Sequence, residues 1–232
     1  MTFKRYAIYY SPPQGALATF GSAWLGWDLD SGKAVAHPEL AGLDTPVAQI
    51  TETPRKYGFH ATLKPPFRLA KDHSFEGLME ACEKICATLK PVTLDGLRLS
   101  QIGRFLALTP VGDETELAAL AASVVRAFDP FRGPQTDSEL ARRRAANLSP
   151  AQEENLLRWG YPYVMDAFHF HMTLTGKMPK SEIAHLREIL TAAVAPHLPT
   201  PFEIRELTLA GEAEDGQFHT IKRFALSGES RA

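Results

Sequence analysis

Two five-residue stretches of this chain differ at one position only, and this repetition constrains the fold more than any other feature. FHATL begins at Phe59, and FHMTL begins at Phe170. The segments that follow also correspond, because Leu97 in LDGLRL lies 37 positions after the first histidine and Leu207 in IRELTL lies 36 positions after the second. RFLAL then follows in one half and RFAL in the other. Self-similarity of this kind indicates a duplicated unit, so we expect two related lobes.

Both halves alternate strand-like and helix-like segments, which is typical of an α/β arrangement. A chain of 232 residues suits one bilobal domain, with a first lobe over about 1–103 and a second over about 104–232. The second half contains an inserted segment, 129–162, which is rich in Arg, Gln and Pro and which we expect to carry two short helices. A pseudo-two-fold axis between the lobes would bring the two histidine strands together.

Composition narrows the functional classes. The chain is 44% hydrophobic and 22% charged, as ordinary soluble proteins are. Its net charge of −2 argues against a protein that coats nucleic acid, although a local basic pocket for one phosphate is compatible with it. Cys82 and Cys86 fall on the apolar face of a predicted helix, which favours inert thiols in a reducing compartment. No signal peptide or membrane span is recognisable, so we expect a cytoplasmic protein.

The segment DAFHFHMTLTG, residues 166–176, alternates polar and apolar side chains with the period of a half-buried strand. The same period runs through GFHATLKPPF, where Pro65 and Pro66 are expected to end the strand. Each predicted strand therefore has a polar face. These faces carry His60, Thr62 and Lys64 in the first lobe, and His169, His171, Thr173 and Thr175 in the second.

If the two strands flank one cleft, that cleft holds two imidazoles and two hydroxyls. Histidine has an unperturbed pKa of about 6.5, so one ring can accept a proton while its partner donates one. Threonine hydroxyls can donate hydrogen bonds to the non-bridging oxygens of a phosphate. Attack and departure at phosphorus are in line, which suits two proton-transfer groups on opposite sides. This pattern predicts metal-free chemistry on a phosphodiester.

The paired H-x-T-hydrophobic motifs resemble those of the 2H phosphoesterase superfamily, which includes RNA 2′,3′-cyclic phosphodiesterases and 2′-5′ RNA ligase-like proteins. The resemblance implies a duplicated bilobal fold with antiparallel-rich sheets, flanking helices and a pseudo-two-fold axis. It also implies that His60 and His171 are catalytic, that Thr62 and Thr173 bind the phosphate, and that neither a metal nor another cofactor is required.

A narrower resemblance lies in PRKYGFHATLKPPF, ELARRRAANLSP and RWGYPYVMDAFHFHMTLTG. These segments are similar to a branch of the superfamily labelled as a phosphonate-metabolism protein. The resemblance implies a small phosphorylated or phosphonate-derived substrate, such as a cyclic ribosyl phosphate. We therefore predict a hydrolase of small cyclic phosphodiesters. The alternatives are an RNA 2′,3′-cyclic phosphodiesterase or 2′-5′ RNA ligase-like enzyme, for which only a short oligonucleotide suits the charge, and a non-catalytic module that binds phosphate esters. The oligomeric state stays open.

Several further residues are candidates for substrate contacts. His169 forms an H-x-H pair with His171, but the first lobe has Gly58 at the matching position, so a metal site lacks a second ligand pair. Lys64 could neutralise a phosphate or simply be solvated. Tyr57 reaches the polar face only if Gly58 interrupts the strand. Arg142 and Arg143, within the run of arginines that ends at Arg144, suit either an exposed helix face or a lid over an anionic substrate.

Overall fold

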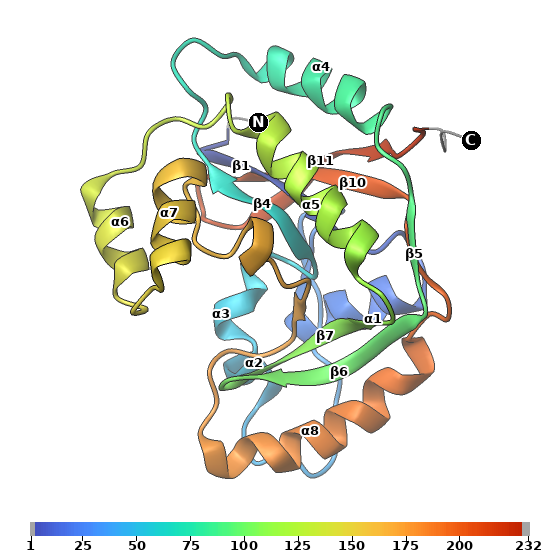
Figure 1. Cartoon of the computed structure of the whole chain (residues 1–232). Helices are drawn as coiled ribbons and strands as arrows, with labels where there is room; N and C mark the ends of the chain where they lie inside the picture. The colour runs from blue at the N-terminus through green and yellow to red at the C-terminus, as the bar shows by residue number, and fades with distance from the viewer. Residues whose placement is uncertain (1–2, 229–232) are drawn as a thin grey trace.

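The computed structural model describes residues 3–228 and contains one seven-stranded sheet in the order β11-β10-β1-β4-β8-β7-β6. Every neighbouring pair in this sheet is antiparallel. The antiparallel-rich sheet and the helices that flank it confirm the predicted fold class (Figure 1). The strands are β1 Arg5–Tyr10, β4 Ala61–Phe67, β6 Gly96–Ile102, β7 Phe105–Val111, β8 Met172–Thr173, β10 Glu206–Glu212 and β11 Phe218–Ala225, with two small sheets formed by β2 Trp27–Asp28 with β3 Lys33–Ala34 and by β5 Val92–Leu94 with β9 Phe202–Ile204.

The two halves of the sheet exchange their hairpins. The β6–β7 hairpin follows β4 in the chain but pairs with β8, whereas the β10–β11 hairpin follows β8 and pairs with β1. The histidine strands β4 and β8 are left side by side in the middle. The expected boundary between the lobes, near residue 103, falls in the turn of the β6–β7 hairpin. The two strands of this hairpin pair with each other, so the boundary does not separate two parts of the sheet.

The helices repeat the same exchange. Helix α4 (Phe75–Cys86) packs against β10 and β11, and its counterpart α8 (Lys180–Val194) packs against β6 and β7. Helix α5 (Thr115–Phe128) crosses β4 (Figure 1). Leu, Ile, Val and Phe side chains from both halves form one continuous core. The remaining helices are α1 Ala16–Leu25, α2 Val47–Ile50, α3 Glu52–Arg55, α6 Asp137–Arg144 and α7 Pro150–Trp159, with 3-10 turns at Met165–Ala167 and Ala195–His197.

The inserted segment 129–162 folds as predicted into two short helices, α6 and α7. Both begin with a capping box, in which Thr136 and Ser149 accept the backbone N–H three residues later. Figure 1 shows the two helices side by side near the end of β4. Across residues 3–228, no helix is long and apolar enough to cross a membrane.

The prediction that the prolines end the first histidine strand is wrong. Strand β4 continues through Pro65 and Pro66 to Phe67. Its partner β8 pairs only at Ala61, so the prolines face no donor-requiring ladder on that side. On the other side the register with β1 shifts twice, which accommodates the missing N–H groups.

The second histidine strand is much shorter than its alternating pattern predicts. Strand β8 contains only Met172 and Thr173, and a 3-10 turn over Met165–Ala167 precedes it. The backbone N–H groups of Leu174 and Thr175 both donate to the carbonyl of Leu106, which breaks the alternation. Thr175 is consequently 1% exposed, and its hydroxyl donates to the Gly176 carbonyl instead of joining the histidine face.

Candidate active site

The register between β4 and β8 brings the two H-x-T motifs together. Ala61 pairs with Met172 in an antiparallel arrangement. One residue to either side, His60 lies opposite Thr173, and Thr62 lies opposite His171. Directly opposite side chains in such a pair have Cβ atoms about 5 Å apart, and the diagonal pair of histidines is separated by about 7–8 Å. Each histidine therefore has the threonine of the other motif as its cross-strand neighbour.

Hydrogen bonds determine the tautomer of His60. Its Nδ1 lies 2.9 Å from the carbonyl oxygen of Gly58, and since a carbonyl can only accept, Nδ1 carries the hydrogen. The lone pair of the neutral ring is then on Nε2, which accepts from the Thr62 hydroxyl at 3.1 Å. Gly58, which precedes β4, has a φ of 69°, a left-handed conformation that glycine adopts readily, and its carbonyl lies against the ring.

His171 is oriented in the same way. Its Nδ1 donates to the carbonyl oxygen of His169 at 2.8 Å, which again leaves Nε2 as the reactive atom. This bond gives His169 a backbone role equivalent to that of Gly58 in the first motif. The side chain of His169 is exposed and borders the cavity beside His171.

Both histidines are neutral at neutral pH in the free protein. The pKa of His60 is lowered to about 4, mainly by burial and slightly by the nearby His171, against the opposing effect of the Gly58 carbonyl. Burial also lowers the pKa of His171, against the effect of the His169 carbonyl. Each ring is thus ready to accept a proton, and a bound phosphate anion would favour the protonated form of either.

Two tyrosines enclose His60. The ring of Tyr9 stacks on the imidazole, with centroids 3.9 Å apart, and the ring of Tyr57 lies 6.1 Å away. The sequence placed Tyr57 near the polar face only if Gly58 broke the extended conformation. Gly58 does so with its left-handed φ, and Tyr57 lies beside His60. Tyr9 is fully buried, and its hydroxyl has no hydrogen-bond partner among residues 3–228. The alternating pattern of the first strand gave no reason to single out Tyr9.

A cavity of about 860 Å³ opens beside His171 and Thr62. The hairpin β6–β7 contributes its polar and aromatic side chains, and Phe105 lies 5.9 Å from the His171 ring. The segment after α7 forms the opposite wall. Residues lining the cavity include Arg98, Ser100, Phe105, Thr109, Tyr161, Tyr163 and Phe168. Such a cavity suits the non-reacting part of a phosphate ester.

Lys64 does not lie on the face of the histidines. The bulge between the Tyr9–Thr62 and Ile8–Lys64 pairs turns Lys64 to the other face of β4, toward α5. There it is 1% exposed, donates to the Val125 carbonyl at 3.2 Å and forms an ion pair with Asp129 at 2.8 Å. Strict alternation, on which its expected position rested, fails at this bulge.

The three arginines of α6 do not act as one exposed face. Arg144 pairs with Glu153 of α7 at 2.6 Å. Arg142 and Arg143 instead line a second cavity beside the end of β4. The guanidinium of Arg143 lies over the Tyr161 ring, 4.5 Å from its centroid.

No metal-binding arrangement accompanies the H-x-H pair. Within residues 3–228, no three His, Cys, Asp or Glu side chains converge as metal ligands would. Cys82 and Cys86 are buried in α4, and burial raises the pKa of Cys86 to about 11, so this thiol is not poised to react.

Comparison with known families identifies the group to which the chain is related. The model of a family described as "Protein of unknown function (DUF1045)" matches residues 62–219, which include both threonines of the site and His171. The chain belongs to this family. The matched region contains the second H-x-T motif complete and begins at the threonine of the first, so His60 lies just before it.

Two curated relatives of this DUF1045 chain carry the same name, "Ribose 1,5-bisphosphate phosphokinase PhnN". The protein from Janthinobacterium sp. (strain Marseille) is 37% identical over 235 residues, which cover 98% of this chain and 52% of the relative. The protein from Laribacter hongkongensis (strain HLHK9) is 34% identical over 188 residues, covering 77% of this chain and 42% of the relative. The DUF1045 chain thus spans about half the length of the curated relatives it matches.

Solved structures with a similar arrangement include TT0787 of Thermus thermophilus, with a TM-score of 0.44, 15% identity and coverage of 97% of this chain and 100% of that one. Another is E. coli LigT complexed with 3′-AMP, with a TM-score of 0.43, 16% identity and coverage of 97% and 99%. Both TM-scores lie below 0.5, so these two structures resemble the DUF1045 chain only distantly.

Proposed function

We propose that this protein hydrolyses a small cyclic phosphodiester by acid–base catalysis from His60 and His171, without a metal. The observation that carries the proposal is the antiparallel pairing of Ala61 with Met172, which brings the two H-x-T motifs side by side. In both rings Nε2 is the nitrogen left for proton transfer, because backbone carbonyls hold both Nδ1 atoms. Thr62 and Thr173 would donate hydrogen bonds to the non-bridging phosphate oxygens.

The two rings suit different steps. His60 has a pKa lowered to about 4, so it is neutral over the wider pH range and suits the general base that takes a proton from the attacking water. His171 borders the open cavity and suits the general acid. As water attacks phosphorus, the bond to one ester oxygen breaks, and Nε2 of His171 gives that oxygen a proton. The products are a phosphomonoester and a free hydroxyl.

A phosphorylated ribose is the substrate class that we favour. The names of the two longer relatives refer to a kinase that acts on ribose 1,5-bisphosphate, and each of those proteins includes a segment similar to this chain. A ribosyl cyclic phosphate is chemically related to that compound, and opening its ring needs only water and the two histidines. This would give the chain a place in phosphonate metabolism, as the narrower sequence resemblance implies.

The aromatic cavity favours one second candidate, a phosphodiesterase for a nucleotide or a short RNA end with a 2′,3′-cyclic phosphate. Phe105, Tyr163 and Phe168 line the space beside His171 and could stack on a base. A preference for cyclic ribose phosphate over 2′,3′-cyclic AMP would exclude a nucleotide or RNA-end phosphodiesterase, and the reverse preference would support one.

Phosphorus NMR with a panel of cyclic phosphodiesters tests the proposal. We expect opening of at least one cyclic phosphate in excess chelator, and no opening by the His60→Ala/His171→Ala double variant. No conversion of any substrate, or a loss of activity in chelator that an added metal restores, would contradict the proposal.

The pH dependence supplies a second test. One ring must be neutral and the other protonated, while the pKa of His60 is about 4 and that of His171 lies below 6.5. We therefore expect kcat/KM to follow a bell-shaped profile with its maximum between about 4 and 6.5, and to fall about tenfold per pH unit on the alkaline side. A plateau that extends to pH 8 would contradict paired-histidine catalysis.

A further inference from the structure

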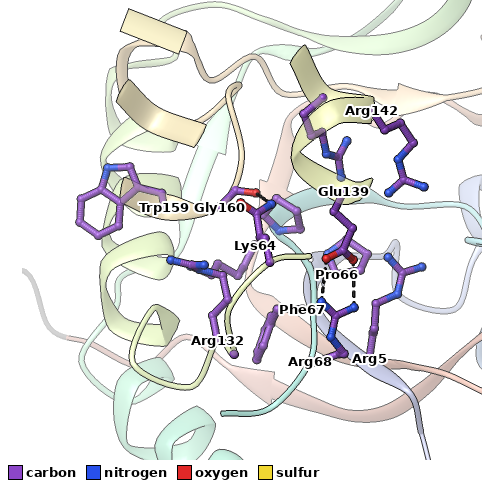
Figure 2. Close-up of a pocket in the computed structure, with 14 residues that line it drawn as sticks. Arg5, Lys64, Pro66, Phe67, Arg68, Arg132, Glu139, Arg142, Trp159 and Gly160 are labelled. Atoms are coloured by element: carbon purple, nitrogen blue, oxygen red, sulfur yellow. Dashed lines mark hydrogen bonds and ion pairs between the residues drawn. The ribbon is translucent and has the colours of Figure 1, made fainter. Parts of the chain in front are cut away.

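A second cavity lies at the end of β4, beside the candidate active site, and its lining is strongly basic. It forms where Arg5 at the start of β1, the end of β4 and the inserted helices meet. Figure 2 shows the side chains of Arg5 and Arg142 entering it from opposite sides, from β1 and from α6. Its charged residues are Arg5, Lys64, Arg68, Arg132, Arg142, Arg143 and a single carboxylate, Glu139.

Ion pairs neutralise only part of this charge. Arg5 pairs with Glu212, and Arg68 pairs with Glu139. Lys64 and Arg132 share one carboxylate, that of Asp129. No ion pair of Arg142 or Arg143 is found within residues 3–228. The cluster of six cations and three carboxylates therefore has an excess of positive charge, which an anion would neutralise.

The pairs also hold the free arginines in position. The two-pronged bond between Arg68 and Glu139, with distances of 2.9 and 2.6 Å, fixes α6 against the end of β4 (Figure 2). Arg142 and Arg143 follow Glu139 by about one turn of the same helix. Arg143 is held further by its stacking on Tyr161. A guanidinium held in this way offers a planar fork of donors that matches phosphate oxygens.

The basic cavity adjoins the cavity beside His171 at two points. Pro65 lines both cavities, and Gly160 lines the basic one while its neighbour Tyr161 lines the other. Arg5 lies on the same face of β1 as Tyr9, which stacks on His60. Four residues of strand separate Arg5 from Tyr9, a distance of roughly 13 Å between Cα atoms that the long arginine side chain shortens.

Within residues 3–228, Tyr9 has an unsatisfied polar group on the strand that carries Arg5, beside the first motif. Its hydroxyl is fully buried without a hydrogen-bond partner among the described residues, and leaving such a group unpaired is costly. Burial raises the pKa of the Tyr9 hydroxyl well above its usual value, so this group stays protonated and able to donate. A ligand or water that bridges the two sites would satisfy it.

We propose that the cavity between Arg5, Arg142 and Arg143 is a second anion subsite, which binds a phosphomonoester group on the same substrate whose cyclic phosphodiester is opened at His60 and His171. The link to the cyclic phosphodiester rests on the proposed function. Binding of a phosphate at the arginines does not, because it requires no turnover. It assigns the inserted helices to recognition of a doubly phosphorylated substrate.

Phosphate binding tests the subsite apart from catalysis. Inorganic phosphate is titrated into two proteins, and binding is measured by calorimetry in both. One carries His60→Ala/His171→Ala, and the other carries Arg142→Ala and Arg143→Ala in addition. We expect the added pair to weaken phosphate binding at least about tenfold, since charge-assisted hydrogen bonds to two guanidinium groups are lost. Arg144→Ala is the matched control, because Arg144 belongs to the same helix but pairs with Glu153.

Equal affinity in the Arg142→Ala/Arg143→Ala and Arg144→Ala proteins would overturn the subsite, as would the absence of phosphate binding up to 50-fold above the protein concentration at low salt. Thermal unfolding of all variants shows whether α6 is still folded. An unfolded Arg142→Ala/Arg143→Ala protein would be replaced by Arg142→Gln/Arg143→Gln, which keeps the side-chain length and removes the charge.

Turnover then links the subsite to the reaction. With otherwise unmodified protein, Arg142→Ala/Arg143→Ala should raise KM about tenfold for a cyclic phosphodiester that carries a phosphomonoester, and should leave KM unchanged for the same compound without it. Equal effects on both substrates would overturn the subsite while leaving the hydrolase intact. If neither substrate is opened but phosphate still binds at the arginines, the proposed hydrolysis fails and the anion site stands.

Discussion

The two halves of the candidate site contain the same four groups in unlike surroundings. His60 is stacked against Tyr9, lies near Tyr57, and has its Nε2 occupied by the Thr62 hydroxyl. His171 follows a short irregular segment and borders a wide cavity. The duplication thus preserved the motif, whereas the enclosure differs between the copies. Unequal enclosure separates the proton affinities of two otherwise equivalent rings, which is what an acid–base pair requires.

The same comparison explains where the substrate would extend. Around His60 the aromatic rings of Tyr9 and Tyr57 lie close, and the basic cavity lies further along β1, at Arg5. Around His171 the hairpin β6–β7 leaves room for a larger group. Under the proposed function, each half would offer a different neighbour to the bound phosphate, one cationic and one mainly aromatic.

The largest expected effect tests which ring is the acid. His60→Ala and His171→Ala should each lower kcat for an unactivated phosphodiester about 100- to 10,000-fold, because each removes a proton-transfer group. With a nitrophenyl ester, whose leaving group departs without protonation, His171→Ala should recover most of the activity and His60→Ala should not. Kinetics with the two substrates provide the measurement.

Recovery by His60→Ala instead would reverse the two roles, and equal losses on both substrates would show that neither ring acts as a general acid. Far-ultraviolet circular dichroism of each variant provides the control for folding. Neither histidine belongs to the hydrophobic core, so both variants are expected to fold.

The difference in enclosure should also appear in the free energy of unfolding. His60 has a pKa of about 4 in the folded protein and 6.5 when unfolded, so it stabilises the fold in its neutral form above pH 6.5 and this contribution is lost as the pH falls toward 4. Removing the ring in His60→Gln should make stability less dependent on pH. We expect the difference in the free energy of unfolding between the original protein and His60→Gln to change by about 2 kcal/mol between pH 7.5 and pH 5.

Urea unfolding at the two pH values measures this change. Parallel curves for the original protein and His60→Gln would show that the imidazole is more solvated than its burial indicates, and would remove the main difference between the two halves.

The sequence predicted the paired histidines, the threonines and the inserted helices because these features depend on local pattern and repetition. FHATL and FHMTL were sufficient to identify His60 and His171 as equivalent. The two helices expected within 129–162 are present as α6 and α7, and each begins at a capping box of contiguous residues. Such signals are written in contiguous residues, and tertiary contacts do not override them.

The misplaced features depend on contacts between distant strands. Lys64 turns away because β4 is bulged against β1, and no property of GFHATLKPPF specifies the register with Tyr9 and Ile8. The hairpin exchange likewise depends on which strand β6–β7 meets in space. Tyr9 was missed for the same reason, since its contact with His60 exists only across that strand pair. A search for buried polar groups without partners would have found it once the fold was known.

The smallest expected effect comes from displacing one of the two backbone carbonyls, of Gly58 and His169, that orient the histidine rings. Gly58 has a φ of 69°, and a Cβ built there would lie 2.9 Å from the Leu29 side chain. Gly58→Ala should therefore strain the backbone by about 1–2 kcal/mol and displace the carbonyl that holds His60 Nδ1. We expect kcat to fall about tenfold, because the His60 ring loses its fixed orientation.

His169→Ala is the matched change in the other half. It removes an exposed side chain but keeps the carbonyl that holds His171 Nδ1 at 2.8 Å, so its kcat should fall less than that of Gly58→Ala. Nitrogen-15 NMR of the two imidazoles reports the tautomers directly: Gly58→Ala should perturb the signals of His60 alone, and His169→Ala should leave the Nδ1-protonated form of His171 in place. If His169→Ala has the larger effect on kcat, the exposed imidazole itself contacts the substrate, and the equivalence of the two carbonyls is not the feature that the repeat preserves.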